Sequence, residues 1–270
     1  MKSDVARIVA AEWLKLRHRR TTVVVPVAVC VMTVVIFFAL ELAARARFTG
    51  LPSGFHVTAA TLDLTTSLVL LLIAVVGTCF HISREFALGT AKSAWTRPLT
   101  RRAWYAGKVL SAGMATSGLF VLTVMVVIVL AAWRFGFTDL MEKDYLVHSA
   151  GNLWWRLALA FALTLWGLWA VVSVVAALAA LFNHPGGAIA AALGLGILFT
   201  ILGMFSAIAP FLLSTCVSLP LDQLAAMSQG LSLPQSWGQT IWRSLLGGGI
   251  WMGAAWAIGL GYIGRKEITS

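Results

Sequence analysis

Long uninterrupted apolar stretches, separated by short charged segments, dominate the pattern of this chain. A helix needs roughly 18 apolar residues or more to cross the hydrocarbon core of a bilayer. Six stretches reach that length, and they run without the polar–apolar alternation of a membrane-spanning strand. We therefore predict six membrane-spanning helices. They lie at about residues 21–41, 64–83, 109–133, 157–182, 188–213 and 244–264.

Proline and glycine residues, and no charged residue, separate the fourth and fifth of these stretches. No charged residue occurs from Leu157 to Leu221, a region too long for one helix. The sequence Asn183-His184-Pro185-Gly186-Gly187 interrupts it, and proline with paired glycines stops a helix. We therefore place a short turn at residues 183–187 between two spans.

The composition supports an all-α polytopic membrane protein. Of 270 residues, 60% are hydrophobic and only 11% are charged. A soluble protein of this size cannot bury so much apolar surface, so the composition excludes an ordinary soluble enzyme. The cysteines, Cys30, Cys79 and Cys216, form no pair with metal-ligand spacing, and we predict no metal site.

The distribution of basic residues predicts the orientation. With six spans, both termini lie on one side, and that side carries fourteen of the twenty Lys and Arg residues. Cytoplasmic segments of membrane proteins are rich in Lys and Arg, so we place both termini in the cytoplasm and the chain in the cell membrane. The same rule accounts for the net charge of +10 without a nucleic-acid partner.

The segment before the first span predicts a basic amphipathic helix at about residues 4–19, lying in the cytoplasmic interface among membrane lipids. Its apolar arc consists of Val5, Ile8, Val9, Trp13 and Leu16. Glu12 falls inside this arc, and it either contacts another part of the protein or pairs with Lys15. An ordinary basic tail is the alternative reading of the segment.

The loop between the second and third spans, residues 84–108, is far longer than a simple connection needs and carries six basic residues. Pro98 should end a first short helix, and Thr100 can cap a second helix that leads into the third span. A charged helical loop of this kind is a candidate docking element for a cytosolic partner.

The motifs of this loop carry a family resemblance. Glu-Phe-x-x-Gly-Thr at residues 85–90, Pro-Leu-Thr-Arg at residues 98–101 and Gly107-Lys108 resemble the cytoplasmic loop of type-2 ABC exporter permeases. The basic Lys-Leu-Arg at residues 15–17 and the six-span layout are also similar to that family. The resemblance covers essentially the whole chain.

The resemblance implies a permease subunit that pairs with a second permease, as a homo- or heterodimer, and docks a separate cytosolic ATPase. ATP and Mg would then lie on the partner, and this chain would hold no cofactor. The loop would form the coupling helix, with residues Arg84, Glu85, Gly89, Thr90, Arg97, Pro98, Arg101 and Arg102 as candidates. The family also implies short outer helices at about 214–241, punctuated here by Pro220 and Pro234.

No catalytic site is expected in this chain. A GxxxxGK[ST] loop, an HExxH motif and a GxSxG motif are all missing from the sequence. The cores of the predicted spans carry no Asp, Glu, Lys or Arg, which argues against a proton-coupled carrier. His81 and His184 are expected to be ordinary residues at span ends. A scaffold subunit and a lipid-modifying membrane enzyme remain the alternative functions.

Two further expectations concern packing and cargo. Gly249, Gly253, Gly187 and Gly194 allow helices to approach closely, either between two subunits or within one. The uncharged spans suggest an apolar or amphipathic cargo, such as a lipid, peptide or drug. Hydroxyl residues within the spans keep other cargos open, among them Thr123, Thr164, Ser173 and Thr200.

Overall fold

The computed structural model describes residues 2–18, 20–46, 53–90, 100–142, 145–205, 208–229 and 236–265. It confirms the all-α polytopic fold, with six helices among these residues long and apolar enough to cross a membrane. The spanning helices are α2 (Thr21–Ala46), the continuous α3–η1–α4 (Gly54–Leu64, Thr65–Leu70, Leu71–Ala87), α6 (Arg101–Arg134), α7 (Ala150–Leu181), α8 (Pro185–Leu202) and α10 (Trp237–Arg265).

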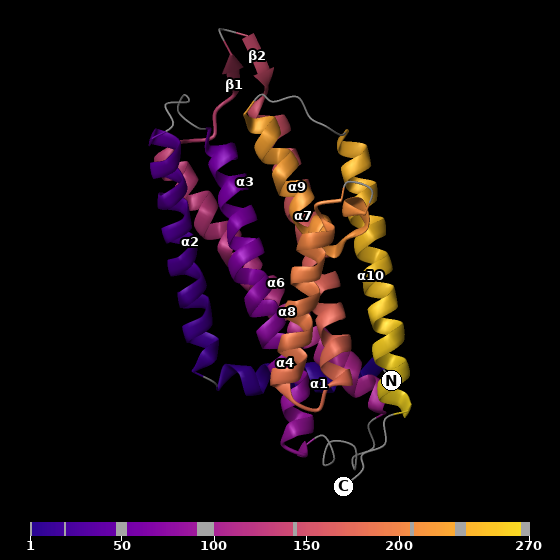
Figure 1. The fold of residues 1–270 in the computed structure, drawn as a ribbon. Helices are drawn as coiled ribbons and strands as arrows, with labels where there is room; N and C mark the ends of the chain where they lie inside the picture. The colour runs from indigo at the N-terminus through magenta and orange to yellow at the C-terminus, as the bar shows by residue number, and fades with distance from the viewer. Residues whose placement is uncertain are drawn as a thin grey trace.

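The bundle has two distinct ends (Figure 1). Helix α1 (Lys2–Arg17) lies across one end, where α10 also finishes, and we call this the termini end. At the opposite end, β1 (Leu140–Glu142) and β2 (Tyr145–His148) form an antiparallel pair, and we call this the hairpin end. This hairpin is a small departure from the predicted helical pattern.

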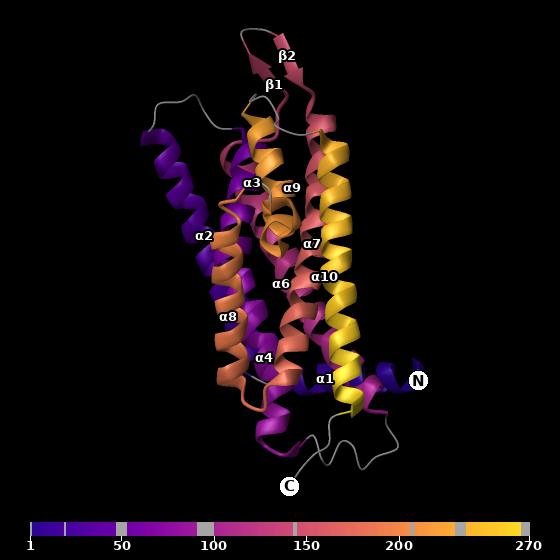
Figure 2. The ribbon, with the colours of Figure 1, turned by 45° about the vertical axis from the view of Figure 1, so that its right-hand side comes forward.

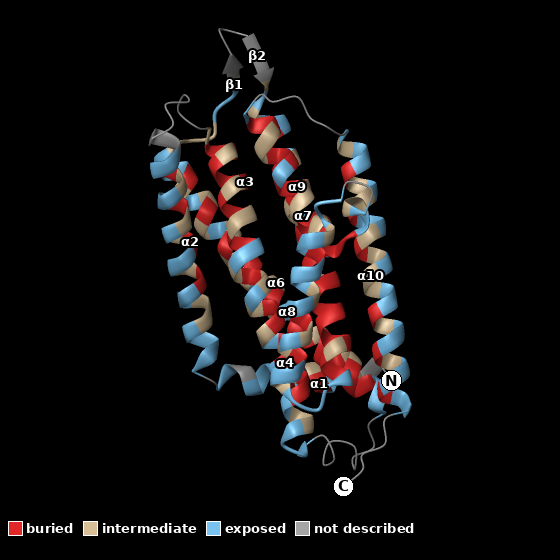
Figure 3. Cartoon of the chain, viewed as in Figure 1, coloured by how far each residue is buried: buried red, intermediate tan, exposed pale blue. Residues whose placement is uncertain are grey.

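Helix α7 forms the centre of the bundle. It is the most buried of the six spanning helices, whereas α2 and α8 are the least buried (Figure 3). Helix α10 packs along α7 more extensively than any other pair of helices, and the two lie side by side in Figure 2. Apolar side chains face outward all round the bundle, as a protein surrounded by acyl chains requires.

Several helices extend beyond the predicted spans. The second span begins at Gly54 instead of residue 64, and the third begins at Arg101 instead of 109. Thr100 caps α6 as predicted, since its side chain accepts a hydrogen bond of 3.2 Å from the Ala103 amide. Hydropathy marks only the part of a helix inside the hydrocarbon, so charged turns at either end are missed.

The fifth span is shorter than predicted, because α8 ends at Leu202 and not at residue 213. The short 3-10 turn η2 (Ala209–Phe211) and helix α9 (Leu213–Ser228) follow it toward the hairpin end. Pro220 was expected to precede a short helix that starts at Leu221, but it lies inside helix α9. Pro234 lies outside the described residues.

The second span is also irregular, because η1 is a π-helical turn.

Candidate functional site

Three elements meet at the termini end: α1, the last turns of α4 and the first turns of α6. Gly107 allows a close approach between α1 and α6, because a Cβ placed there would lie 2.6 Å from Ile8 Cγ2. The glycine therefore brings the polar side chains of α1 within hydrogen-bonding distance of α6.

Lys108, next to this contact, is the centre of a buried charged cluster. Its side chain is only 2% exposed, and its Nζ lies 2.9 Å from Glu12 Oε1 of α1 and 2.5 Å from Glu85 Oε1 of α4. One ammonium group thus joins two carboxylates from two other helices. Such a contact fixes the relative positions of α1, α4 and α6.

Two more residues, Lys15 and His81, complete the cluster. Lys15 Nζ lies 2.7 Å from Glu12 Oε1 and 3.4 Å from Glu85 Oε1, at the solvent-facing edge of the cluster. His81 Nε2 lies 3.6 Å from Glu12 Oε2 and 2.8 Å from Ser111 Oγ. The cluster therefore holds two carboxylates and two ammonium groups, with His81 and Ser111 covering its inner side. We call residues Glu12, Lys15, His81, Glu85 and Lys108 the charged cluster.

Helix α1 contributes Glu12 and Lys15 to the charged cluster, and these two residues stabilise each other in their charged forms. Burial alone would raise the pKa of the Glu12 carboxyl, but Lys108 and Lys15 more than offset it, and the pKa falls below its ordinary value. Burial alone would likewise lower the pKa of Lys15, but hydrogen bonding to Glu12 raises it overall. Both shifts favour the charged forms in the folded state.

The predicted coupling residues divide into two groups. Glu85 points inward and belongs to the charged cluster, whereas Arg84, Gly89, Thr90, Arg101 and Arg102 are exposed at the termini end. Gly89 has φ +68°, a left-handed conformation that follows the last turn of α4 and suits glycine. Arg97 and Pro98 lie outside the described residues.

The apolar arc predicted for α1 is shared between the bundle and the membrane. Ile8 is buried against Gly107, and Val5 and Val9 are half-buried. Trp13 is 59% exposed, and Leu14 beside it is exposed to a similar degree. The Leu16 side chain lies outside the described residues. The helix therefore attaches to the bundle along the side of Ile8 and presents Trp13 to the surroundings.

The glycines singled out from the sequence do not mark the tightest helix contacts within the chain. A Cβ added at Gly194 or Gly253 would meet nothing within 4 Å, and one at Gly187 or Gly249 would make only ordinary or slightly tight contacts. The close approaches are elsewhere: Gly259 lies against the Tyr105 hydroxyl, and a Cβ at Gly113 would lie 2.5 Å from the Trp169 ring.

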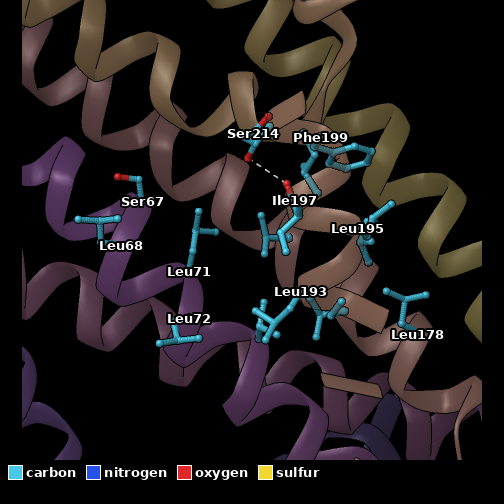
Figure 4. A pocket seen from close by; sticks show the side chains of 18 residues that line it. Ser67, Leu68, Leu71, Leu72, Leu178, Leu193, Leu195, Ile197, Phe199 and Ser214 are labelled. Carbon is cyan, nitrogen blue, oxygen red and sulfur yellow. Dashed lines mark hydrogen bonds between the residues drawn. The ribbon is translucent and has the colours of Figure 1, made fainter. Parts of the chain in front are cut away.

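An apolar cavity of about 370 Å³ lies between α4, α7, α8 and the start of α9. Figure 4 shows leucines of α4 and α8 facing each other across it, with Ser67 and Ser214 nearby. Of the span hydroxyls named above, Thr200 lines this cavity. Thr123, Ser173 and Thr200 all donate hydrogen bonds to carbonyls of their own helices.

Comparison with known protein families matches residues 8–203 to the family described as ABC-2 family transporter protein. The match runs from α1 through the charged cluster and the cavity helices to the end of α8. The chain belongs to the ABC-2 transporter family. No curated protein sequence matches it. As an ABC-2 family protein it is a multi-pass membrane component of a transporter, and family membership implies a nucleotide-binding partner.

Sequence reasoning missed two members of the charged cluster in this ABC-2 protein. Lys108 was noted only as part of a family motif, and His81 was expected to be an ordinary boundary residue, yet it lies within 3.6 Å of Glu12. The sequence feature that could have indicated the cluster is Glu12, because a carboxylate inside an apolar arc needs a partner. The structure shows that both suggested explanations hold, because Glu12 contacts Lys15 and also other helices.

Proposed function

We propose that this chain is the membrane-spanning permease subunit of an ATP-driven ABC exporter, acting as a dimer with a second permease. Its termini end faces the cytoplasm and docks a separate ABC ATPase, which carries ATP and Mg. The loop at residues 84–108 is the main docking element. Closure of the ATPase dimer moves this element, and the movement opens a pathway for cargo between the two permeases.

The observation that carries this proposal is the charged cluster beneath the docking element. A force applied to the exposed end of α4 reaches α1 and α6 through the contacts of Glu85 with Lys108 and Lys15. Ser83 adds a further connection, since its hydroxyl donates 2.9 Å to the Ala179 carbonyl of α7. The three elements can therefore move as one body, which is what coupling to an external ATPase requires.

The orientation is supported by exposed basic residues at the termini end. Arg7, Arg17 and Arg20 are exposed on or beside α1, and Arg84, Arg101 and Arg102 are exposed around the loop. Cations in such positions favour the cytoplasmic side of a membrane. They also offer a positive surface to an ATPase with an acidic docking groove.

The experiment that tests docking is charge reversal at exposed residues of the loop. The full-length permease is co-expressed with a candidate partner ABC ATPase from the same organism, purified as a complex and reconstituted in liposomes. Arg84→Glu and Arg102→Glu are each expected to reduce the ATP hydrolysis stimulated by the permease by about tenfold, because reversed charge disfavours docking. Arg243→Glu, which alters the hairpin end, serves as the matched control and is expected to leave hydrolysis unchanged.

Two results would count against the proposal. One is the failure of the wild-type chain to form any complex with the ATPase, which would favour a scaffold role. The other is a complex whose ATP hydrolysis is equally insensitive to all three reversals, which would place docking away from the loop.

A further inference from the structure

The second spanning helix holds a group of buried hydroxyls that have no hydrogen-bond partner among the described residues. They belong to Thr58, Thr61, Thr65 and Thr66. Each of these residues is at most 1% exposed. Buried hydroxyls normally have a partner, because an unpaired one away from water costs free energy. Thr33 and Thr123, which are also buried, donate to carbonyls of their own helices at 2.7 Å and 2.9 Å. The four threonines are therefore exceptions that need an explanation.

Three of the four threonines face α6. At 3.6 residues per turn, Thr58, Thr61 and Thr65 fall within an arc of about 60°. Val57 borders this arc on one side and Leu62 on the other, and each belongs to an apolar cluster that includes a residue of α6. We call Thr58, Thr61 and Thr65 the threonine face. Part of the contact between α3 and α6 thus consists of hydroxyls that make no specific bond.

The π-helical turn η1 lies directly below this face. Its backbone bonding is wider than that of an α-helix, because the Leu71 amide donates to the Thr66 carbonyl, five residues earlier. The Ser67 hydroxyl adds bonds to the carbonyls of Asp63 and Leu64, at 2.8 Å and 3.3 Å. Helices change direction at such turns, and π-helical turns are frequent at functional positions. The turn divides the second span into α3 and α4.

The two halves of this span are bound to different neighbours. Helix α3 is bound to α9, since His56 Nδ1 lies 3.3 Å from the Ala225 carbonyl oxygen and His56 Nε2 lies 2.9 Å from Gln229 Nε2. Helix α4 is bound to α6 through the contact of Glu85 with Lys108. A movement of α4 therefore carries α6 with it, whereas α3 stays with α9.

We propose that η1 is a hinge at which α4 turns relative to α3, while α6 slides along the threonine face. In the structure the hydroxyls of Thr65 and Thr66 are unpaired. In the turned state they donate to carbonyls of their own helix, as those of Thr33 and Thr123 do. The unpaired hydroxyls disfavour the present state and so bring the two states close in free energy. This inference goes beyond the proposed function, and it rests on the fold alone.

Valine substitutions separate the hydroxyls from the shape of the side chain. The double variant Thr65→Val with Thr66→Val keeps the volume and removes two unpaired hydroxyls, so it should favour the present state. Thr123→Val is the matched control, because it removes a buried hydroxyl that has a partner. Deletion of Leu68, which is 63% exposed, takes one residue out of the π-helical turn and should give a continuous α-helix without a hinge.

The measurement is the distance between two spin labels in the purified full-length permease, reconstituted in liposomes without an ATPase. The labels are attached at Arg84→Cys, on the exposed end of α4, and at Arg265→Cys, at the end of α10, after the native cysteines are replaced by alanine. Double electron–electron resonance is expected to give two distances in the otherwise unchanged chain and in Thr123→Val. The valine pair and the Leu68 deletion are each expected to give one.

A second measurement tests whether the hydroxyls are unpaired. The valine pair is expected to unfold at a higher SDS concentration than the wild type, and Thr123→Val at the same or a lower one. A valine pair that unfolds at less SDS than the wild type would overturn the inference, because the hydroxyls would then have partners such as bound water. A single narrow distance in the wild type, unaltered by the valine pair, would also overturn it.

The valine pair alone carries the test if the Leu68 deletion does not fold. Because no ATPase is present in either measurement, failure of the hinge leaves the proposed docking of an ATPase unaffected. Loss of docking in the charge-reversal experiment would likewise leave the two distances unchanged.

Discussion

Replacing Lys108 with methionine is expected to destabilise the folded permease by about 3 kcal/mol or more. Methionine keeps much of the volume but removes the buried one of the two ammonium groups that the Glu12 and Glu85 carboxylates share. Both charges would then lie in a poorly solvated site, and removing one partner of a buried ion pair is far costlier than removing an exposed one. The measurement is the free energy of unfolding in mixed micelles titrated with SDS.

Lys15→Met is the control for this prediction because it removes an ammonium group from the same two carboxylates. Its side chain is 51% exposed, so we expect a loss below about 1 kcal/mol. The double variant Glu12→Gln with Lys108→Met should cost less than the sum of the two single changes, since the partners are in contact. Equal effects for Lys108→Met and Lys15→Met would show that burial of the cluster contributes nothing.

Replacing Glu12 with glutamine is expected to change the pH dependence of stability. The Glu12 pKa is lower in the folded state than its ordinary value of 4.5, so the folded state favours the ionised form. Its contribution is complete above about pH 4.5 and is lost as the pH falls toward and through the folded pKa. Glu12→Gln should therefore cost about 2 kcal/mol at pH 7, and the difference from wild type should shrink below pH 4.5.

The measurement is the same free energy of unfolding, taken at steps from pH 7 to pH 3. The slopes of the two proteins differ by at most about 1.4 kcal/mol per pH unit, the limit for one titrating group. Asp4→Asn removes a carboxylate from the same helix outside the charged cluster and controls for net charge. A Glu12→Gln penalty that stayed constant across this range would contradict an ionised, stabilising Glu12.

The sequence predicted the number and order of the spanning helices because hydropathy reports directly on burial in hydrocarbon. It also located the Thr100 cap, since a hydroxyl before a helix start has a local partner. It could not place the interruption after Leu202, because the chain stays apolar through Phe205 and Ile208 and nothing in hydropathy marks the break.

The charged cluster was only partly predictable, for a different reason. Glu12 could be recognised as misplaced on an apolar face, but its partner Lys108 lies 96 residues away (108 − 12). Only the packing of α1 on α6 through Ile8 and Gly107 brings the two together. The cavity was likewise invisible, because it depends on spacing between helices and on a π-helical turn that no local pattern signals.

The central claim is that the termini end faces the cytoplasm, because an ATPase that uses cytoplasmic ATP could not otherwise dock there. The most direct measurement labels single cysteines on intact cells with a membrane-impermeant maleimide, in a chain whose three native cysteines are replaced by alanine. Thr90→Cys reports the exposed end of α4, and Ser149→Cys reports the hairpin end, where Ser149 caps α7. We predict labelling of the cysteine at 149 on intact cells and of the cysteine at 90 only after lysis. Labelling of position 90 on intact cells, with position 149 protected, would contradict the account.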